Sequence, residues 1–281
     1  MRRLTPAPGI LAFYDGREGA REYEEPNWLD DGALILGIAS YAIVDGDEAL
    51  VYDTHLSVDR ARWIREQLGA AKITVVLSHR HADHVAGTEA FADCEVLAGA
   101  QTARLLGEQR ESFGAATPPI EPLVLPTGEV PPALQVGSIA VQALPFDIHA
   151  SDHTLLWLPE RRILLAADAV EDPVTVVAEP DRIEAHLREL DRLEALDPER
   201  ILPAHGDPDV IAAGGYDVGI IEAMRVYLTA LLAGDRRPVR EILEGPLRHG
   251  WIHWYPAYEA VHEMNLESVA RRGTSSGDGG N

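Results

Sequence analysis

Cysteine and basic residues are scarce in this sequence, and each scarcity excludes a class of protein. Cys94 is the one cysteine among 281 residues, so no intrachain disulfide can form and a reducing compartment is compatible. Basic residues number 24 against 46 acidic ones, which gives a formal net charge of -22. Such an excess repels phosphate backbones, and no Lys/Arg cluster offsets it locally. We therefore expect no nucleic acid as substrate or partner.

Long apolar runs are absent as well. No stretch approaches the ~18 apolar residues of a membrane span. The first nine residues include Arg2 and Arg3 but lack the continuous apolar core of a secretory signal. We expect a cytoplasmic protein without a membrane partner. Hydrophobic residues make up 46% of the chain and charged residues 25%, as in ordinary globular proteins, and the length allows one large domain or two small ones.

Apolar strand patterns and helical patterns alternate through the first part of the chain, which predicts an α/β protein. Strands are expected at residues 33–36, 40–44, 49–52, 73–77, 95–97, 139–144, 154–158, 163–166 and 200–203. Helices are expected at residues 57–68, 84–92, 101–107 and 181–196. The proline-rich segment 114–132 is predicted to be a loop or lid at a pocket mouth.

The C-terminal part is predicted to be helical, at residues 220–232, 239–243 and 257–270. Trp251, Trp254, Tyr255 and Tyr258 cluster within it. Because aromatic residues dominate cores and interfaces, this cluster indicates a helix-packing core or a homodimer interface rather than a substrate wall. The small, polar tail 273–281 is expected to be disordered.

Four side chains that commonly bind metals crowd into one short stretch. They are His79, His81, Asp83 and His84, and they directly follow the expected strand 73–77. Imidazole nitrogen and carboxylate oxygen suit zinc, iron or manganese. Because one buried strand delivers all four groups to a single loop, the stretch predicts a metal site. A polar turn that is merely rich in histidine is the alternative.

Further candidate ligands lie at or just past the ends of later expected strands. They are His149, His153, Asp168 and His205. Loops at strand ends allow a rigid sheet to bring together side chains from distant parts of the sequence. The placement of these residues therefore strengthens the prediction of a metal site.

This pattern resembles the metallo-β-lactamase superfamily. The hallmark of that family, His-x-His-x-Asp-His, is matched by residues 79–84, and Gly87 supplies the small residue that usually follows. The family's Asp-Thr after an early strand is matched by Asp53-Thr54, although His55 stands where a glycine is usual. The resemblance covers roughly residues 33 to 210.

The later candidates match the remaining motifs of the family. His149 matches the third motif, and Asp168 follows it at the family's common spacing of 19 residues, which favours His149 over His153 as a ligand. His205, followed by a glycine, matches the last motif. Full retention of the motifs implies a site for two divalent metal ions, with zinc preferred over iron or manganese.

The resemblance also implies how the ligands are divided. His79, His81 and His149 would hold the first metal, Asp83, His84 and His205 the second, and Asp168 would bridge them. The implied fold is a four-layer αβ/βα sandwich with a helical C-terminal extension. We divide the chain accordingly into a metallo-β-lactamase-like hydrolase domain at 1–234 and an extension at 235–272 that packs on it.

Two metals so placed imply hydrolysis of a small-molecule ester, lactone or thioester by attack of a metal-bridging hydroxide. Asp83 is expected to be catalytic, as a ligand that also orients the hydroxide and shuttles its proton. Asp53 is expected to orient the histidine loop, and His153 to contact the substrate or the surroundings of the metals. The alternatives are hydrolysis of a β-lactam or amide and the iron-dependent chemistry of sulfur dioxygenases.

Two other histidines are expected to have no ligand role. His186 lies off the apolar stripe formed by Ile183, Leu187 and Leu190, so it is expected in solvent. His55 is expected to support the ligands or to lie on the surface.

Overall fold

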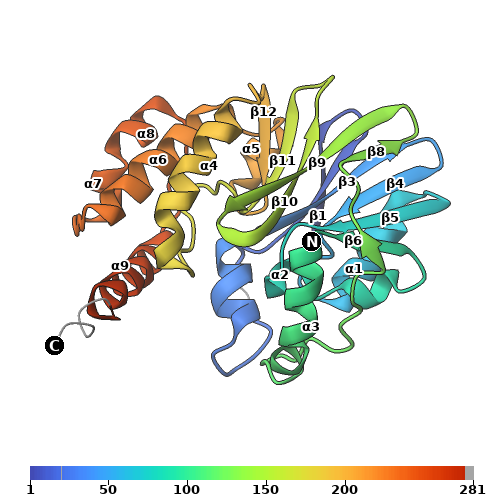
Figure 1. Ribbon diagram of the computed structural model, residues 1–281, viewed down its shortest axis with the longest axis horizontal. Coiled ribbons are helices and arrows are strands. Elements are labelled where there is room, and N and C mark those ends of the chain that lie inside the picture. The colour runs from blue at the N-terminus through green and yellow to red at the C-terminus, as the bar shows by residue number, and fades with distance from the viewer. Residues whose placement is uncertain (20, 276–281) are drawn as a thin grey trace.

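The computed structural model describes residues 1–19 and 21–275 and contains two β-sheets (Figure 1). The strands of the first sheet are β1 (Arg2–Ala7), β2 (Ile10–Asp15), β3 (Ile38–Asp45), β4 (Glu48–Tyr52), β5 (Lys72–Leu77), β6 (Glu95–Ala98) and β7 (Gly128–Glu129). The strands of the second sheet are β8 (Ala133–Val136), β9 (Ile139–Ile148), β10 (Ala150–Leu158), β11 (Ile163–Ala167) and β12 (Arg200–Pro203). The strand orders are β1-β2-β3-β4-β5-β6-β7 and β12-β11-β10-β9-β8.

Helices cover the outer face of each sheet (Figure 1). The first sheet carries α1 (Val58–Leu68), α2 (Ala82–Val85) and α3 (Ala100–Gly114). The helices beyond the second sheet begin with α4 (Ile183–Glu194), α5 (Pro208–Ala212) and α6 (Gly219–Leu232) and continue with α7 (Val239–Ile242), α8 (Glu244–His249) and α9 (Tyr258–Ser275). The predicted αβ/βα sandwich with a helical C-terminal part is confirmed. The domain boundary at residue 234 stays a prediction.

The period-2 pattern of the strands explains the layers. In β3, Tyr41 belongs to the core that includes the second sheet, whereas the next residue, Ala42, belongs to the core under α1. Successive side chains of a strand point to opposite faces, so one strand serves both cores. Two buried hydroxyl groups also join the sheets: Tyr41 donates to the carbonyl of Pro203, and Tyr52 donates to that of Thr154.

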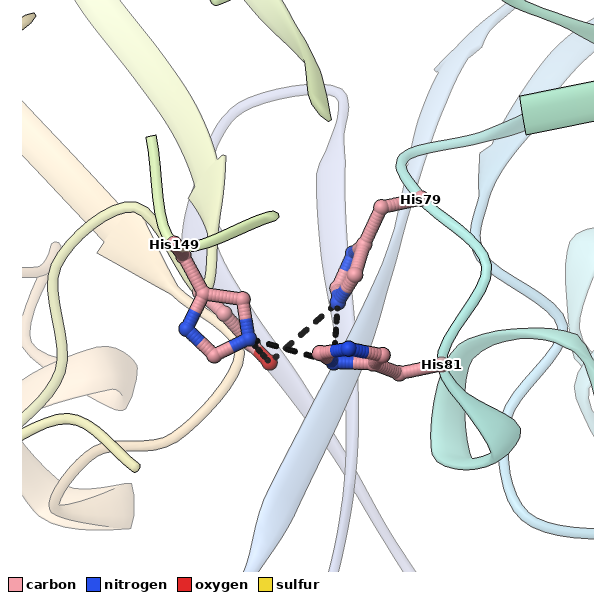
Figure 2. Close-up of side chains that lie close together, drawn as sticks. His79, His81 and His149 are labelled. Carbon is pink, nitrogen blue, oxygen red and sulfur yellow. Dashed lines mark hydrogen bonds and ion pairs between the residues drawn. The ribbon is translucent and has the colours of Figure 1, made fainter. Parts of the chain in front are cut away.

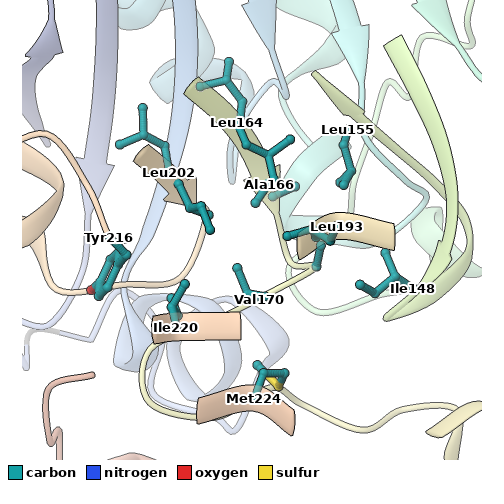
Figure 3. Close-up of a cluster of buried hydrophobic side chains, with 14 of the residues drawn as sticks. Ile148, Leu155, Leu164, Ala166, Val170, Leu193, Leu202, Tyr216, Ile220 and Met224 are labelled. Atoms are coloured by element: carbon teal, nitrogen blue, oxygen red, sulfur yellow. The ribbon is translucent and has the colours of Figure 1, made fainter. Parts of the chain in front are cut away.

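The outer core of the second sheet holds the C-terminal helices in place. Leu193 of α4 and Met224 of α6 lie in one buried cluster with Leu164 and Leu202 of the sheet (Figure 3). Tyr258, at the start of α9, is fully buried in the same cluster. Apolar burial contributes roughly 25 cal/mol per Å². The helices beyond α6 are therefore anchored on the sheet through a shared core.

Residues 33–36, expected as a strand, are instead helical. A π-helix spans Leu29–Leu34, and β3 begins only after it. Asn27 explains this start, because its side-chain oxygen accepts a hydrogen bond from the backbone nitrogen of Asp30 at 2.8 Å. The buried leucines of this segment form a small core of their own. The apolar residues 33–36, whose pattern predicted a strand, therefore belong to a helical turn.

The hairpin of β1 and β2 has no counterpart among the expected elements. β2 is buried along nearly its whole length and pairs antiparallel with β3. Gly9, with φ +72, makes the turn between the two strands, and a Cβ there would lie 2.9 Å from the carbonyl oxygen of Val44. Because both sides of β2 are covered, residues 10–14 are apolar or aromatic and show no alternation that would reveal a strand.

Several element boundaries differ from the predictions. The expected helix 84–92 is divided into α2 and a 3₁₀ turn, Thr88–Phe91. The disordered tail was expected to begin at residue 273, but α9 continues to Ser275. Residues 276–281 lie outside the described residues. Among the described residues, no helix combines the length and apolar character needed to span a bilayer.

Candidate metal centre

Loops from both sheets meet at one edge, and the predicted site residues lie in these loops. β4 runs parallel to β5, and β11 runs parallel to β12, so the carboxyl ends of the strands in each pair point the same way. The loops after these strands and after β9 carry Asp53, the 79–84 run, His149, Asp168 and His205. The two sheets therefore bring together side chains that are more than 150 residues apart.

One group consists of His79, His81, His149 and Asp168 (Figure 2). Nδ1 of His81 lies 2.9 Å from Nε2 of His79 and 3.1 Å from Nε2 of His149. Oδ2 of Asp168 lies 3.6 Å from Nε2 of His79 and 3.5 Å from Nε2 of His149. Four ligand atoms from three loops thus surround one point.

A second group consists of Asp83, His84, Asp168 and His205. Nε2 of His84 lies 3.1 Å from Oδ2 of Asp168 and 3.8 Å from Oδ2 of Asp83. Nε2 of His205 lies 3.2 Å from Oδ2 of Asp83 and 3.8 Å from Oδ1 of Asp168. Asp168 is therefore common to both groups and lies between them.

The spacing of these atoms fits divalent metals. Zinc binds imidazole nitrogen at about 2.0–2.1 Å, which places tetrahedral ligand atoms about 3.4 Å apart. The separations in both groups, from 2.9 to 3.8 Å, lie around that value. Oδ1 of Asp168 is buried and has no hydrogen-bond partner within the described residues. A buried polar atom without a partner is rare, and a role as a metal ligand accounts for this one. The residues present therefore fit a metal pair.

The comparisons with known proteins agree with this geometry. The family model described as the Metallo-beta-lactamase superfamily matches residues 35–205, well over half of the chain. The chain belongs to the metallo-β-lactamase superfamily. Its His and Asp residues are positioned to bind metal, as the superfamily's metallo-hydrolase chemistry requires.

Solved structures share the fold at low sequence identity. A metallo-beta-lactamase from Pontibacter korlensis is 16% identical, with a TM-score of 0.61 over 81% of this chain and 98% of that one. The DIM-1 metallo-beta-lactamase exposed to ceftazidime is 18% identical, with a TM-score of 0.58 over 82% and 96%. FIM-1 from Pseudomonas aeruginosa, in a mono-zinc form, is 14% identical, with a TM-score of 0.54 over 79% and 94%. No curated protein sequence matches this chain.

In this superfamily member, hydrogen bonds on the far side of the His84 and His205 rings orient their Nε2 atoms toward the second metal position. Nδ1 of His84 lies 2.8 Å from Oδ2 of Asp53, and Nδ1 of His205 lies 2.7 Å from the carbonyl oxygen of Gly37. Each acceptor fixes the proton on Nδ1 and the orientation of the ring, so that Nε2 is the nitrogen that faces the metal position. Asp53 also accepts from the backbone nitrogen of Ser78 at 2.7 Å, so it ties the histidine loop to β4.

His149 is oriented by a chain of two partners that the sequence analysis did not identify. Its Nδ1 lies 3.0 Å from the Thr175 hydroxyl, and that hydroxyl donates to Oε1 of Glu171 at 2.6 Å. Burial raises the pKa of Glu171 to about 8, although His205 opposes the shift. The signal that could have identified Glu171 is an acidic residue inside the apolar stretch that follows Asp168.

The two groups differ in their protonation. Burial lowers the pKa of His79 well below its usual value, and the neighbouring histidines lower it further. Burial alone would also lower the pKa of His205, but the Asp168 and Asp83 carboxylates raise it to about 9. The same carboxylates raise the pKa of His84 despite its burial. A metal that binds the second group therefore displaces protons, whereas the rings of the first group are already neutral.

His153 and His55 lie beside the site but in neither group. His153 stacks on His79 with ring centroids 4.6 Å apart, and its Nδ1 lies 3.1 Å from the carbonyl oxygen of Ile148. His153 thus packs against His79, a candidate ligand. His55 is fully buried and has φ 67, a left-handed conformation that favours glycine.

His186, expected in solvent, is buried and supports the site. Its Nδ1 accepts from the backbone nitrogen of His149 at 3.4 Å, and its Nε2 lies 3.0 Å from the carbonyl oxygen of Ala169. Burial lowers its pKa to about 4, so the ring is neutral. The prediction placed the buried face of this helix at Ile183, Leu187 and Leu190. The buried positions of α4 are instead Ile183, His186, Leu190 and Leu193.

Replacing His186 by leucine should weaken the metal held by His149. The change removes a hydrogen bond to each of two loops that carry candidate ligands, and the loss of such outer partners costs about 10- to 100-fold in metal affinity. Titration against a competing chelator measures the effect. His249→Leu, at an exposed histidine of α8, is the matched control and should bind metal normally. Unchanged affinity in the His186 variant would contradict the supporting role.

His205→Ala should separate the two groups. His205 contacts Asp83 and Asp168 through Nε2, so its loss removes a ligand of the second group alone. We expect one ion per chain to remain and turnover to fall by at least about 100-fold. Elemental analysis and steady-state kinetics measure both effects, and His149→Ala should deplete the other ion. Equal loss of both ions in the His205 variant would show that the division of ligands is wrong.

Proposed function

We propose that this protein is a dinuclear metal-dependent hydrolase of a small-molecule ester, lactone or thioester. The observation that carries the proposal is the pair of ligand groups that share Asp168 beside a cavity of about 270 Å³. His81, Asp83, His149 and His205 also line that cavity. A substrate in the cavity would therefore meet both metal positions at once.

The roles of the residues follow from their positions. His79, His81 and His149 would hold one ion, Asp83, His84 and His205 would hold the other, and Asp168 would serve both. Bound divalent ions of this kind, zinc or alternatively iron or manganese, supply a nucleophilic water at neutral pH and polarise the scissile carbonyl. Burial opposes ionisation of Asp83, but His84 and His205 lower its pKa to about 2. Asp83 is thus an anion that accepts a hydrogen bond from the attacking water and orients it.

The test combines metal loading with a substrate panel. Metal-free protein would be loaded with zinc, iron or manganese and assayed with aryl esters, lactones, acyl thioesters and a chromogenic cephalosporin. We expect turnover of at least one ester, lactone or thioester that rises with loading up to two ions per chain. Turnover of the cephalosporin alone would favour β-lactam hydrolysis, the activity named for the structural relatives. A fully loaded protein that hydrolyses none of the panel would contradict the proposal.

A further inference from the structure

The cavity in front of the metal groups is walled by two apolar segments from opposite ends of the chain. One wall is the helical turn near the N-terminus, and the other is α9 together with Ala257, which directly precedes it. Their apolar lining residues are Trp28, Ala33, Ile35, Leu36, Ala257, Ala260, Val261 and Met264. The Trp28 side chain is fixed, because its Nε1 donates to the carbonyl oxygen of Pro118 at 2.9 Å. The segment expected to be a lid thus supports one wall instead of covering the mouth.

The charged side chains around this cavity, apart from the histidines, are acidic. Among the described residues that line it, none is lysine or arginine, and carboxyl groups come from Asp31, Asp83, Asp168 and Glu171. A substrate carboxylate at the apolar walls would lose its hydration and gain no cationic partner.

Arg17 and Arg21 bind residues that line the cavity, but they do not line it themselves. Arg17 donates to the carbonyl oxygen of Leu36 at 2.7 Å, and its guanidinium lies 4.3 Å from the centre of the Tyr255 ring. Arg21 forms an ion pair with Asp31, and its Nη2 donates to the carbonyl oxygen of Glu25. Neither side chain lines the cavity, so neither serves as an anchor for an anionic group.

The mouth of the cavity is apolar as well. Ile35 on one wall is 45% exposed, and Met264 on the other is 56% exposed. Single exposed apolar side chains are common, but these two belong to opposite walls of one cavity. An apolar chain that leaves the cavity between them would cover both.

We propose that the site takes an uncharged substrate whose apolar acyl arm lies between the segment 28–36 and α9, with Met264 as a specificity-determining residue at the mouth. This proposal rests on the proposed hydrolase function and names its substrate class. Each methylene of the arm buried against the walls should raise kcat/KM by two- to fourfold. A carboxylate at the end of the arm should lower kcat/KM by about 100-fold or more.

The test uses metal-loaded protein and aryl esters of acetate, butyrate, hexanoate and octanoate, together with the aryl monoester of adipate. The adipate and hexanoate arms have the same length and differ only in the terminal carboxylate. Met264→Lys should lower kcat/KM for the hexanoate ester and raise it for the adipate ester. Val218→Lys is the control, because Val218 is 42% exposed and does not line the cavity, so the ratio of the two values should stay unchanged.

The outcomes separate this proposal from the proposed function. Hydrolysis of all the esters without dependence on arm length, or with adipate equal to hexanoate, would overturn the substrate class and leave the hydrolase intact. Calorimetric binding of a dialkyl ketone and its ω-carboxylate analogue tests the same preference without turnover. The neutral ketone should bind wild-type protein at least tenfold more tightly, and Met264→Lys should reverse the order. Equal binding of the two ketones would overturn the proposal even in a protein that hydrolyses nothing.

Discussion

Replacing Asp168 by alanine should leave less than half of the wild-type metal content and nearly abolish turnover. Both ligand groups depend on this carboxylate, whose Oδ2 lies within 3.6 Å of the rings of His79, His84 and His149. Loss of an outer partner of a ligand costs about 10- to 100-fold. Loss of a group that serves both ions should exceed that range in kcat/KM. Elemental analysis and steady-state kinetics on the same sample measure the two effects.

The control for this change is Asp59→Asn. Asp59 is the first acidic residue of α1, and its side chain is 93% exposed, so its loss removes one negative charge without touching the site. We expect normal metal content and normal turnover in this variant. Full metal occupancy together with normal turnover in the Asp168→Ala protein would refute the shared role of Asp168.

Gly87→Ala should lower the free energy of unfolding by about 3 kcal/mol or more. A Cβ at this position would lie 2.1 Å from the carbonyl oxygen of Thr54 and 2.5 Å from Cβ of Ala61. Neither atom is the end of a flexible side chain, so relief requires the backbone to move. That movement would displace the loop of Asp53 and Thr54. Asp53 accepts a hydrogen bond from the backbone nitrogen of Ser78, and its Oδ2 lies beside Nδ1 of His84.

Denaturant unfolding of metal-free protein measures this prediction, because bound metal would add its own stabilisation. Gly107→Ala is the matched control. Gly107 lies on the exposed side of α3, with no atom of the described residues within 4 Å of a Cβ. Since alanine favours a helix over glycine, this variant should gain about 0.5–1 kcal/mol. A Gly87→Ala protein with the wild-type unfolding midpoint would show that the contact is not a constraint.

Local features of the sequence were sufficient for the parts of the fold that depend on neighbouring residues. α1 forms where a helix is expected at 57–68, and Ser57 caps it, with its hydroxyl accepting from the backbone nitrogen of Arg60. The 79–84 run follows β5 and brings ring and carboxylate groups into one loop, because consecutive residues cannot move far apart. The family pattern added the later candidates, each near a strand end. These features by themselves determined which side chains could meet at a metal centre.

Only the tertiary structure decided what surrounds that centre. Its cavity is walled by Ile35 and Met264, which are far apart in sequence and lie in segments that show no local sign of a shared site. His186 is buried because β9 and the loop after β11 converge on α4, and Glu171 meets His149 through Thr175 for the same reason. The periodicity of a sequence shows which face of a helix or strand is apolar. Which element packs against that face depends on the tertiary structure. The cavity lies between elements that are distant in sequence, so its walls could not be predicted from local patterns.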